Sequence, residues 1–68
     1  MTVGTKMQQT IASAESVMAN LKSFALETQD QAAKTLFQNL AQSQQTIVEN
    51  LNARLQYIQQ QEPQYKNQ

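Results

Sequence analysis

The chain has 68 residues, no Cys, no His and a formal net charge of zero. This length allows one small domain, which has little net stability without a disulfide, a metal or a second chain. The missing Cys and His exclude disulfides, thiolate metal sites and the commonest general base. Association with another chain is therefore the remaining route to stability. The few basic residues are scattered, so nucleic-acid binding lacks its usual electrostatic footprint.

No apolar run is longer than Phe24–Leu26, so we expect neither direct membrane insertion nor a secretory signal peptide. Gln is frequent enough to suggest a low-complexity tract. Regular apolar spacing and the good helix propensity of Gln favour helices over disorder. We expect a cytoplasmic protein.

The first helix is predicted at about residues 3–27. Thr5–Gln8 has the form of a capping box, and a start at Thr2 is the alternative, with Gly4 in the first turn. Val3, Val17 and Phe24 widen the apolar stripe on one flank. The stripe itself recurs at steps of four and three, close to a heptad seam, and contains Met7, Ile11, Ala14, Met18, Leu21 and Ala25.

A turn is predicted at about residues 28–30. The apolar pattern shifts there by about one residue, roughly a 100° rotation, so one straight helix cannot keep both stripes on one face. Thr28–Gln31 has the form of a second capping box, with Asp30 near the positive end of a new helix. A continuous bent helix is the alternative, because no Gly or Pro marks the break.

The second helix is predicted at about residues 30–61, before Pro63, and a polar tail follows at 62–68. One side of this helix is polar and rich in Gln. The apolar stripe on the other side contains Ala33, Leu36, Phe37, Leu40, Ile47, Val48, Leu51, Leu55 and Ile58.

These elements predict an all-α fold, a two-helix antiparallel hairpin in one domain, 1–68. Folding the chain near Asp30 places Met18 opposite Leu40 and Ile11 opposite Ile47. Large apolar side chains then meet at nearly every layer, as the fold requires.

Gln44 is the exception on the second stripe, opposite Ala14. A buried amide must find hydrogen bonds. We favour a place at the edge of the stripe, where the amide reaches water. The alternatives are a bond to Glu15, or to Gln44 of a second copy, where it would fix the register.

Both stripes are wider than one helix pair can cover, and the second helix outruns the first. We therefore predict a homodimer of two hairpins, a four-helix bundle. The candidate residues for self-association or a partner interface are Val17, Phe24, Leu36, Phe37, Leu40, Gln44, Ile47, Val48, Leu51, Leu55, Ile58 and Tyr65.

We expect a non-enzymatic structural or interaction protein with no catalytic residue, cofactor or metal site. The carboxylates lie off the stripes without the His that di-iron bundles use, and the single Gly excludes a phosphate loop. The alternative is a bundle that binds a small molecule or ion, such as dipicolinate or Ca²⁺. Dipicolinate needs buried basic groups, and Arg54 alone lies near a stripe.

Three segments carry a resemblance to a known family: Met1–Gly4, Phe24–Asp30 followed by Ala33–Lys34, and Glu62–Lys66. In their order and spacing they resemble, across nearly the whole chain, the family catalogued as domain of unknown function 1657. That family has no established active site, so no functional residue is carried over.

The resemblance implies a context more than a mechanism. Such proteins are small, helical and stand-alone, and occur in spore-forming Firmicutes. Their genes tend to lie beside those of stage V sporulation membrane proteins that move dipicolinic acid, and the domain also occurs fused to, or encoded beside, a YetF-type membrane domain. The resemblance thus implies an accessory of the forespore or spore inner membrane, with a sporulation membrane protein as partner.

Overall fold

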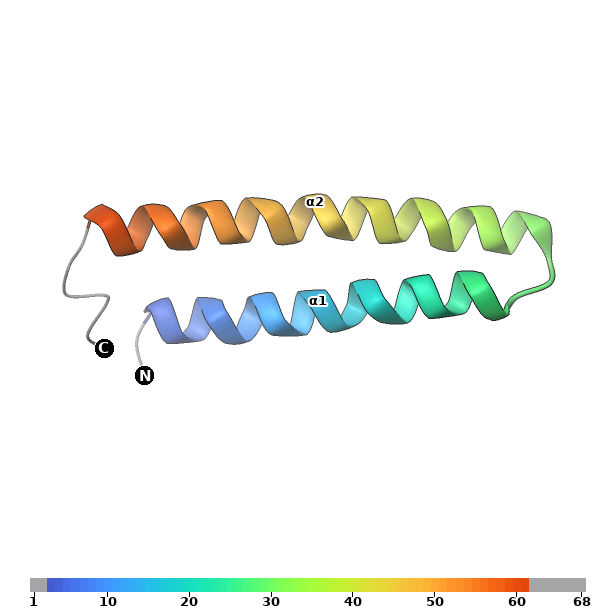
Figure 1. The fold of residues 1–68 in the computed structure, drawn as a ribbon, viewed down its shortest axis with the longest axis horizontal. Helices are drawn as coiled ribbons and strands as arrows, with labels where there is room; N and C mark the ends of the chain where they lie inside the picture. The colour runs from blue at the N-terminus through green and yellow to red at the C-terminus, as the bar shows by residue number, and fades with distance from the viewer. Residues whose placement is uncertain (1–2, 62–68) are drawn as a thin grey trace.

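The computed structural model describes residues 3–61 and shows an all-α antiparallel hairpin (Figure 1). Helix α1 spans Val3–Glu27 and α2 spans Gln31–Gln61. The two helices run side by side, and the start of α1 and the end of α2 lie at the same end, which we call the open end. The predicted fold class is confirmed. The predicted tail, 62–68, lies outside the described residues.

Helix α1 begins earlier than the capping box at Thr5–Gln8 predicted. Its first helical residue is Val3, and Gly4 is already a buried helical residue. Glycine costs least near a helix start, where the backbone N–H groups lack helical partners in any case. The start that places Gly4 in the first turn is therefore the correct alternative.

Three residues, Thr28 to Asp30, connect the helices, so the continuous bent helix is wrong. The Thr28 backbone N–H donates to the Phe24 carbonyl oxygen (N···O 3.0 Å) and closes α1. The Asp30 carbonyl oxygen accepts from the Lys34 N–H (2.9 Å), which makes Asp30 the N-cap of α2 in place of the predicted Thr28. No non-glycine residue in the described range has a positive φ, which explains why this turn needs no Gly.

Each helix contributes one narrow seam to the core. Ile11, Ala14, Val48 and Leu55 form a buried cluster, and Met7 and Leu51 pack against it. The α1 seam continues the heptad spacing and contains Gly4, Met7, Ile11, Ala14, Met18, Leu21, Ala25 and Thr28. The α2 seam has the same spacing and contains Lys34, Phe37, Ala41, Gln44, Val48, Leu51, Leu55 and Ile58.

The α2 seam is narrower than the predicted stripe. Leu36, Leu40 and Ile47 are 53%, 42% and 49% exposed. Ala41 and Val48, each one position further along, are 5% and 6% exposed and hold the buried places. The predicted layers that set Leu40 and Ile47 against α1 are therefore wrong by one residue, because a single partner helix covers only part of a broad apolar stripe.

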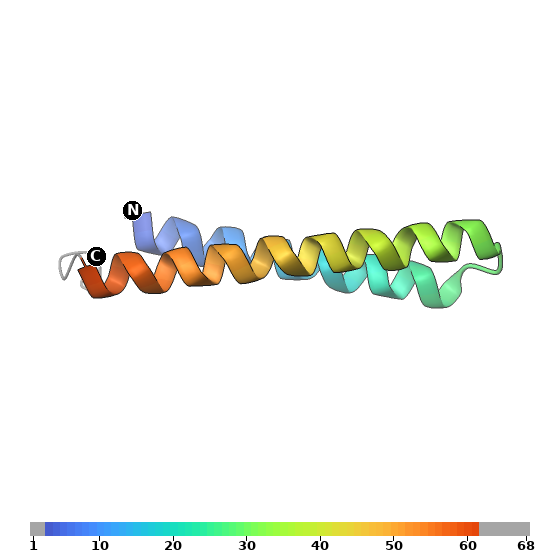
Figure 2. The same cartoon turned by 90° about the horizontal axis from the view of Figure 1, so that it is seen from above.

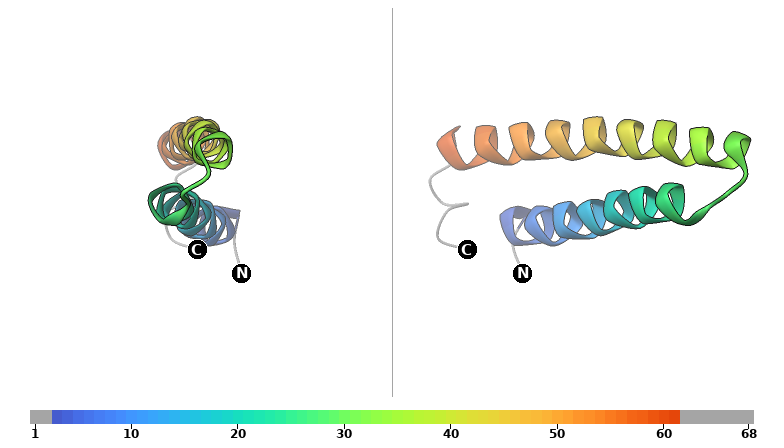
Figure 3. Two further views of the ribbon diagram at one scale, coloured as in Figure 1. Left: turned by 90° about the vertical axis from the view of Figure 1, so that its right-hand side faces the viewer. Right: turned by 45° about the vertical axis from the view of Figure 1, so that its right-hand side comes forward.

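The hairpin is one helix layer thick. Its extents are 49 × 18 × 10 Å, and its shortest dimension is close to the diameter of a single helix. The view along the helix axes shows two helices with no second layer (Figure 3), and the view from above shows them crossing at a shallow angle (Figure 2). Within residues 3–61, neither helix is long and apolar enough to cross a membrane.

Candidate interaction surface

The seam divides the hairpin into two sides. A residue that precedes a seam residue and one that follows it lie on opposite flanks of a helix, because successive residues turn by about 100°. Lys22 follows the seam residue Leu21, Gln38 follows Phe37, and the two side chains line the same groove. Positions that follow seam residues thus share one side of the hairpin, and positions that precede them share the other.

The side formed by preceding positions is apolar. In the part of the chain that the structure describes, eight large apolar side chains are at least 42% exposed. Seven of the eight immediately precede a seam residue. The exception, Leu26, follows Ala25 and is 81% exposed. We call the surface formed by these seven residues the apolar side: Val3, Val17, Phe24, Leu36, Leu40, Ile47 and Tyr57.

Aromatic contacts mark both ends of the apolar side. Near the turn, the rings of Phe24 and Phe37 lie 5.5 Å apart at 59°, within the range of favourable tilted pairs. These two rings, with Glu27 and Thr28, line a shallow hollow. Toward the open end, the Arg54 guanidinium lies 4.9 Å from the centre of the Tyr57 ring, in cation–π geometry. Phe24 and Tyr57 remain 46% and 51% exposed.

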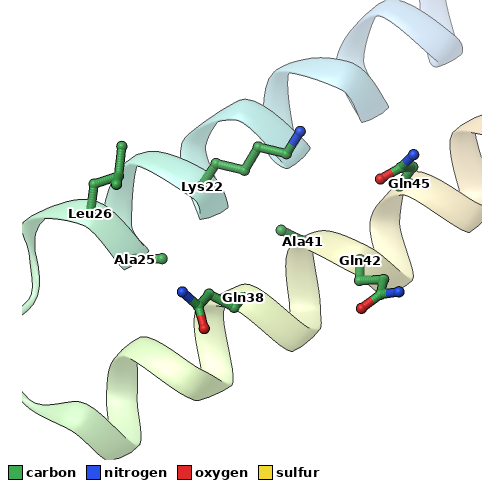
Figure 4. A pocket seen from close by; sticks show the side chains of 7 residues that line it. All are labelled: Lys22, Ala25, Leu26, Gln38, Ala41, Gln42 and Gln45. Atoms are coloured by element: carbon green, nitrogen blue, oxygen red, sulfur yellow. The ribbon is translucent and has the colours of Figure 1, made fainter.

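The opposite surface, which we call the polar side, is built from residues that immediately follow a seam residue. Its members, all exposed, include Gln8, Glu15, Lys22, Gln38, Gln45 and Asn52. The Gln45 side-chain nitrogen donates to the Glu49 carboxylate (Nε2···Oε2 3.3 Å) along this side. Figure 4 shows its groove, in which longer side chains from both helices surround Ala25 and Ala41. The groove exists because two seam positions that approach each other carry only methyl groups.

Gln44 lies in the seam and is half-buried. Its Nε2 donates to the Ala14 backbone carbonyl oxygen at 3.0 Å. Gln44 therefore lies in the seam and not at the edge of the stripe, and its Nε2 bonds the backbone of α1 instead of the predicted alternative Glu15. A bond to Gln44 of a second copy stays a prediction. The carbonyl oxygen has a second lone pair beyond its helical bond, and the short Ala14 side chain leaves room for the approach.

The structure divides the predicted interface residues into two groups. Val17, Phe24, Leu36, Leu40 and Ile47 lie exposed on the apolar side. Six others lie in the seam facing α1, and Tyr65 lies outside the described residues; the six are Phe37, Gln44, Val48, Leu51, Leu55 and Ile58. The structure adds to the exposed group Val3, which the sequence already places on the flank of the first stripe, and Tyr57, which lies where the second helix outruns the first.

The described residues offer little for ligand chemistry. No group of three or more His, Cys, Asp or Glu that could hold a metal ion occurs within residues 3–61. Arg54, the basic residue predicted to lie at the edge of a stripe, is exposed and lies over the Tyr57 ring on the apolar side. The dipicolinate alternative therefore gains no support from this arrangement.

A single-layer helical hairpin with one apolar and one polar side belongs to the class of small all-α proteins. The family model described as protein of unknown function (DUF1657) matches residues 7–55, most of the hairpin including its turn. The chain belongs to this family, as the resemblance of its segments indicated. No curated protein and no solved structure matches the chain.

Proposed function

We propose that this chain is a non-enzymatic interaction protein whose apolar side binds protein, and that it acts as an accessory in sporulation. Its partners are itself and a sporulation membrane protein, at the forespore or spore inner membrane. The observation that carries the proposal is the collection of seven exposed apolar side chains on one side of a molecule one helix thick.

An exposed apolar side of this kind favours burial against another surface. Single exposed apolar residues are common, whereas a contiguous set along a whole face marks an interaction site. Leu36 and Leu40 lie one helical turn apart, and Ile47 follows two turns later, so these side chains form a continuous ridge. Burying them against a partner removes apolar area from water.

The residue content supports a role without catalysis. The chain has no His or Cys, so nucleophilic and acid–base chemistry near neutral pH lacks its usual groups. Glu15 and Glu49 lie on the polar side and Glu27 on the opposite side, and no group of three or more His, Cys, Asp or Glu that could hold a metal ion occurs within residues 3–61. A zero net charge also fits protein partners better than nucleic acid.

The sporulation context comes from the family resemblance, and the hairpin is compatible with it. A helical accessory can dock on a membrane protein without a spanning segment of its own.

The test replaces Leu40 with Gln in the chain expressed from its native locus in a spore-forming host. Spores of Leu40→Gln and of a deletion strain should contain less dipicolinic acid than wild-type spores. Leu26→Gln, the same change on the polar side, should leave the content normal at equal protein levels. A normal content in the deletion strain would contradict the sporulation role.

A further inference from the structure

We propose that the apolar side is covered by a second copy of this chain, and that the two hairpins lie end for end. In this four-helix bundle the open end of one hairpin lies against the turn of the other, and both polar sides face outward. The inference rests on the proposed function, because it names the first partner of the apolar side.

The hairpin lacks the second layer that a stable domain needs. Domains are built from at least two packed layers around one core, and this molecule has one, 10 Å thick. Its accessible surface is 4933 Å². A compact monomer of this mass exposes about 4300 Å². The excess is comparable to the roughly 800 Å² that each partner buries in a standard protein interface.

The apolar side is complementary to itself. Val3, Val17 and Phe24 on α1 are separated by multiples of seven residues, as are Leu40 and Ile47 on α2. Two surfaces with the same heptad spacing interdigitate along their length, which is the packing rule of four-helix bundles. A second hairpin also has the length required to cover this side from Val3 to the turn.

The charges on this side select the orientation. Within residues 3–61, the charged residues that precede seam residues are Lys6, Arg54 and Glu27. Lys6 and Arg54 lie toward the open end, and Glu27 lies at the turn. End-for-end packing brings Lys6 and Arg54 of one copy near Glu27 of the other, whereas turn-to-turn packing brings like charges together. Such exposed pairs set orientation more than affinity.

The first experiment measures molar mass by sedimentation equilibrium on the full chain, with helicity followed by circular dichroism. The mass should rise to twice 7.7 kDa with concentration. Leu40→Gln should weaken the association at least about tenfold, as expected when a polar group replaces an apolar anchor buried in an interface. Leu26→Gln should leave the association unchanged. A helical monomer at all concentrations, or equal effects of the two variants, overturns the proposal.

The second experiment needs no interface variant. The chain has no Cys, so Gln29→Cys in the turn and Gln56→Cys near the open end each accept one spin label. In an end-for-end pair, the two labels of each variant lie at opposite ends of the bundle, so both label-to-label distances are about 40 Å, the length of α2 from the turn to Gln56 at 1.5 Å per residue. Turn-to-turn packing places the two labels of each variant at the same end of the bundle, so both distances are far shorter than the 49 Å length of the hairpin. Two long distances support the proposal, and two short ones or no intermolecular distance overturn it.

These outcomes are separate from the test of the proposed function. A helical monomer together with a spore defect in Leu40→Gln leaves the apolar side as a binding surface for another protein, so the self-association alone fails. A dimer together with normal spores leaves the self-association standing, so the sporulation role fails.

Discussion

At the scale of single residues, Gln44 is the polar side chain placed in the seam with a partner on the other helix. Its Nε2 bonds the Ala14 carbonyl oxygen, which already has a helical hydrogen-bonding role. A neutral hydrogen bond contributes little net stability, because both groups also bond water in the unfolded chain. Its role in the fold is therefore to define how α1 and α2 align, as polar seam residues do in coiled coils.

We predict that Gln44→Leu raises the free energy of unfolding by about 1 kcal/mol, because an apolar side chain of similar size replaces a half-buried amide. The Ala14 carbonyl keeps its helical bond, so no acceptor is left unpaired. Urea unfolding followed by circular dichroism measures the change. Gln56→Leu, at an exposed position of the same helix, is the control and should change stability by less than about 0.5 kcal/mol. A loss of stability in Gln44→Leu would show that the amide contributes more than alignment.

Asp30 determines where α2 begins. Its carbonyl oxygen accepts the first bond of the helix, and a carboxylate at this position lies near the positive end of the helix dipole. We predict that Asp30→Ala lowers the free energy of unfolding by about 1 kcal/mol, and that Asp30→Asn retains most of that stability. Thermal unfolding at low ionic strength checks both variants. Equal losses in the two would assign the effect to charge instead of capping.

At the scale of elements, the orientation of α2 separates neighbours with opposite roles. Val48 is 6% exposed in the core cluster, and Ile47 is 49% exposed on the apolar side. We predict that Val48→Ala lowers the free energy of unfolding by about 2 kcal/mol, because it leaves a cavity between the helices. Ile47→Ala should destabilise only where hairpins associate. Unfolding measured at low and high protein concentration distinguishes the two variants. A loss of stability in Ile47→Ala that is the same at every concentration would contradict the orientation of α2.

Much of the fold follows from apolar spacing alone. The heptad seam of α1 from Met7 to Ala25 and the shift near Thr28 are strong periodic signals, and together they predict the hairpin. The rotation of α2 is harder, because Leu40 and Ile47 are as apolar as the buried Val48. A broad stripe shows that a helix has an apolar face, and only the partner decides which part of it becomes the seam. Ala41 is absent from the predicted stripe because Leu40, directly before it, is the larger apolar residue.

The helix ends show a similar limit. Thr5 and Thr28 both begin sequences with the form of a capping box, yet Val3 is the first residue of α1 and Asp30 is the N-cap of α2. Threonine and aspartate are both good caps, so a local pattern cannot rank them. The choice depends on how many residues the chain needs to reverse direction while Thr28 stays half-buried in the seam.

At the scale of the whole molecule, the buried apolar residues are few and small: Ile11, Ala14, Ala25, Ala41, Val48 and Leu55. A core of this size offsets little of the conformational entropy lost on folding. Burial of the apolar side in a second interface would add the missing stability. Folding and association are then linked.

We therefore predict that the midpoint of thermal unfolding rises with protein concentration, because a dimer that unfolds to monomers is stabilised by mass action. Thermal melts followed by circular dichroism over a wide range of protein concentration measure this midpoint. Leu40→Gln should lower the midpoint and flatten its dependence, whereas Leu26→Gln should keep the native dependence. A midpoint that is the same at every concentration in the native chain would show that one hairpin is stable alone.

The short loop also decides whether the molecule remains a closed hairpin. Thr28 to Asp30 separate the helices with two backbone hydrogen bonds at their edges and one capping residue. Replacing Thr28, Gln29 and Asp30 together with Ala removes the cap and favours helix throughout. One continuous helix over residues 3–61 cannot pack on itself, so we expect it to exchange helices with another copy.

Small-angle X-ray scattering should then show a radius of gyration well above the 15.4 Å of the hairpin, toward about 25 Å for a straight helix of that length. Gln29→Ala alone keeps both loop hydrogen bonds and should leave the radius unchanged. An unchanged radius in the triple variant would show that the contacts between α1 and α2 close the hairpin without help from the loop.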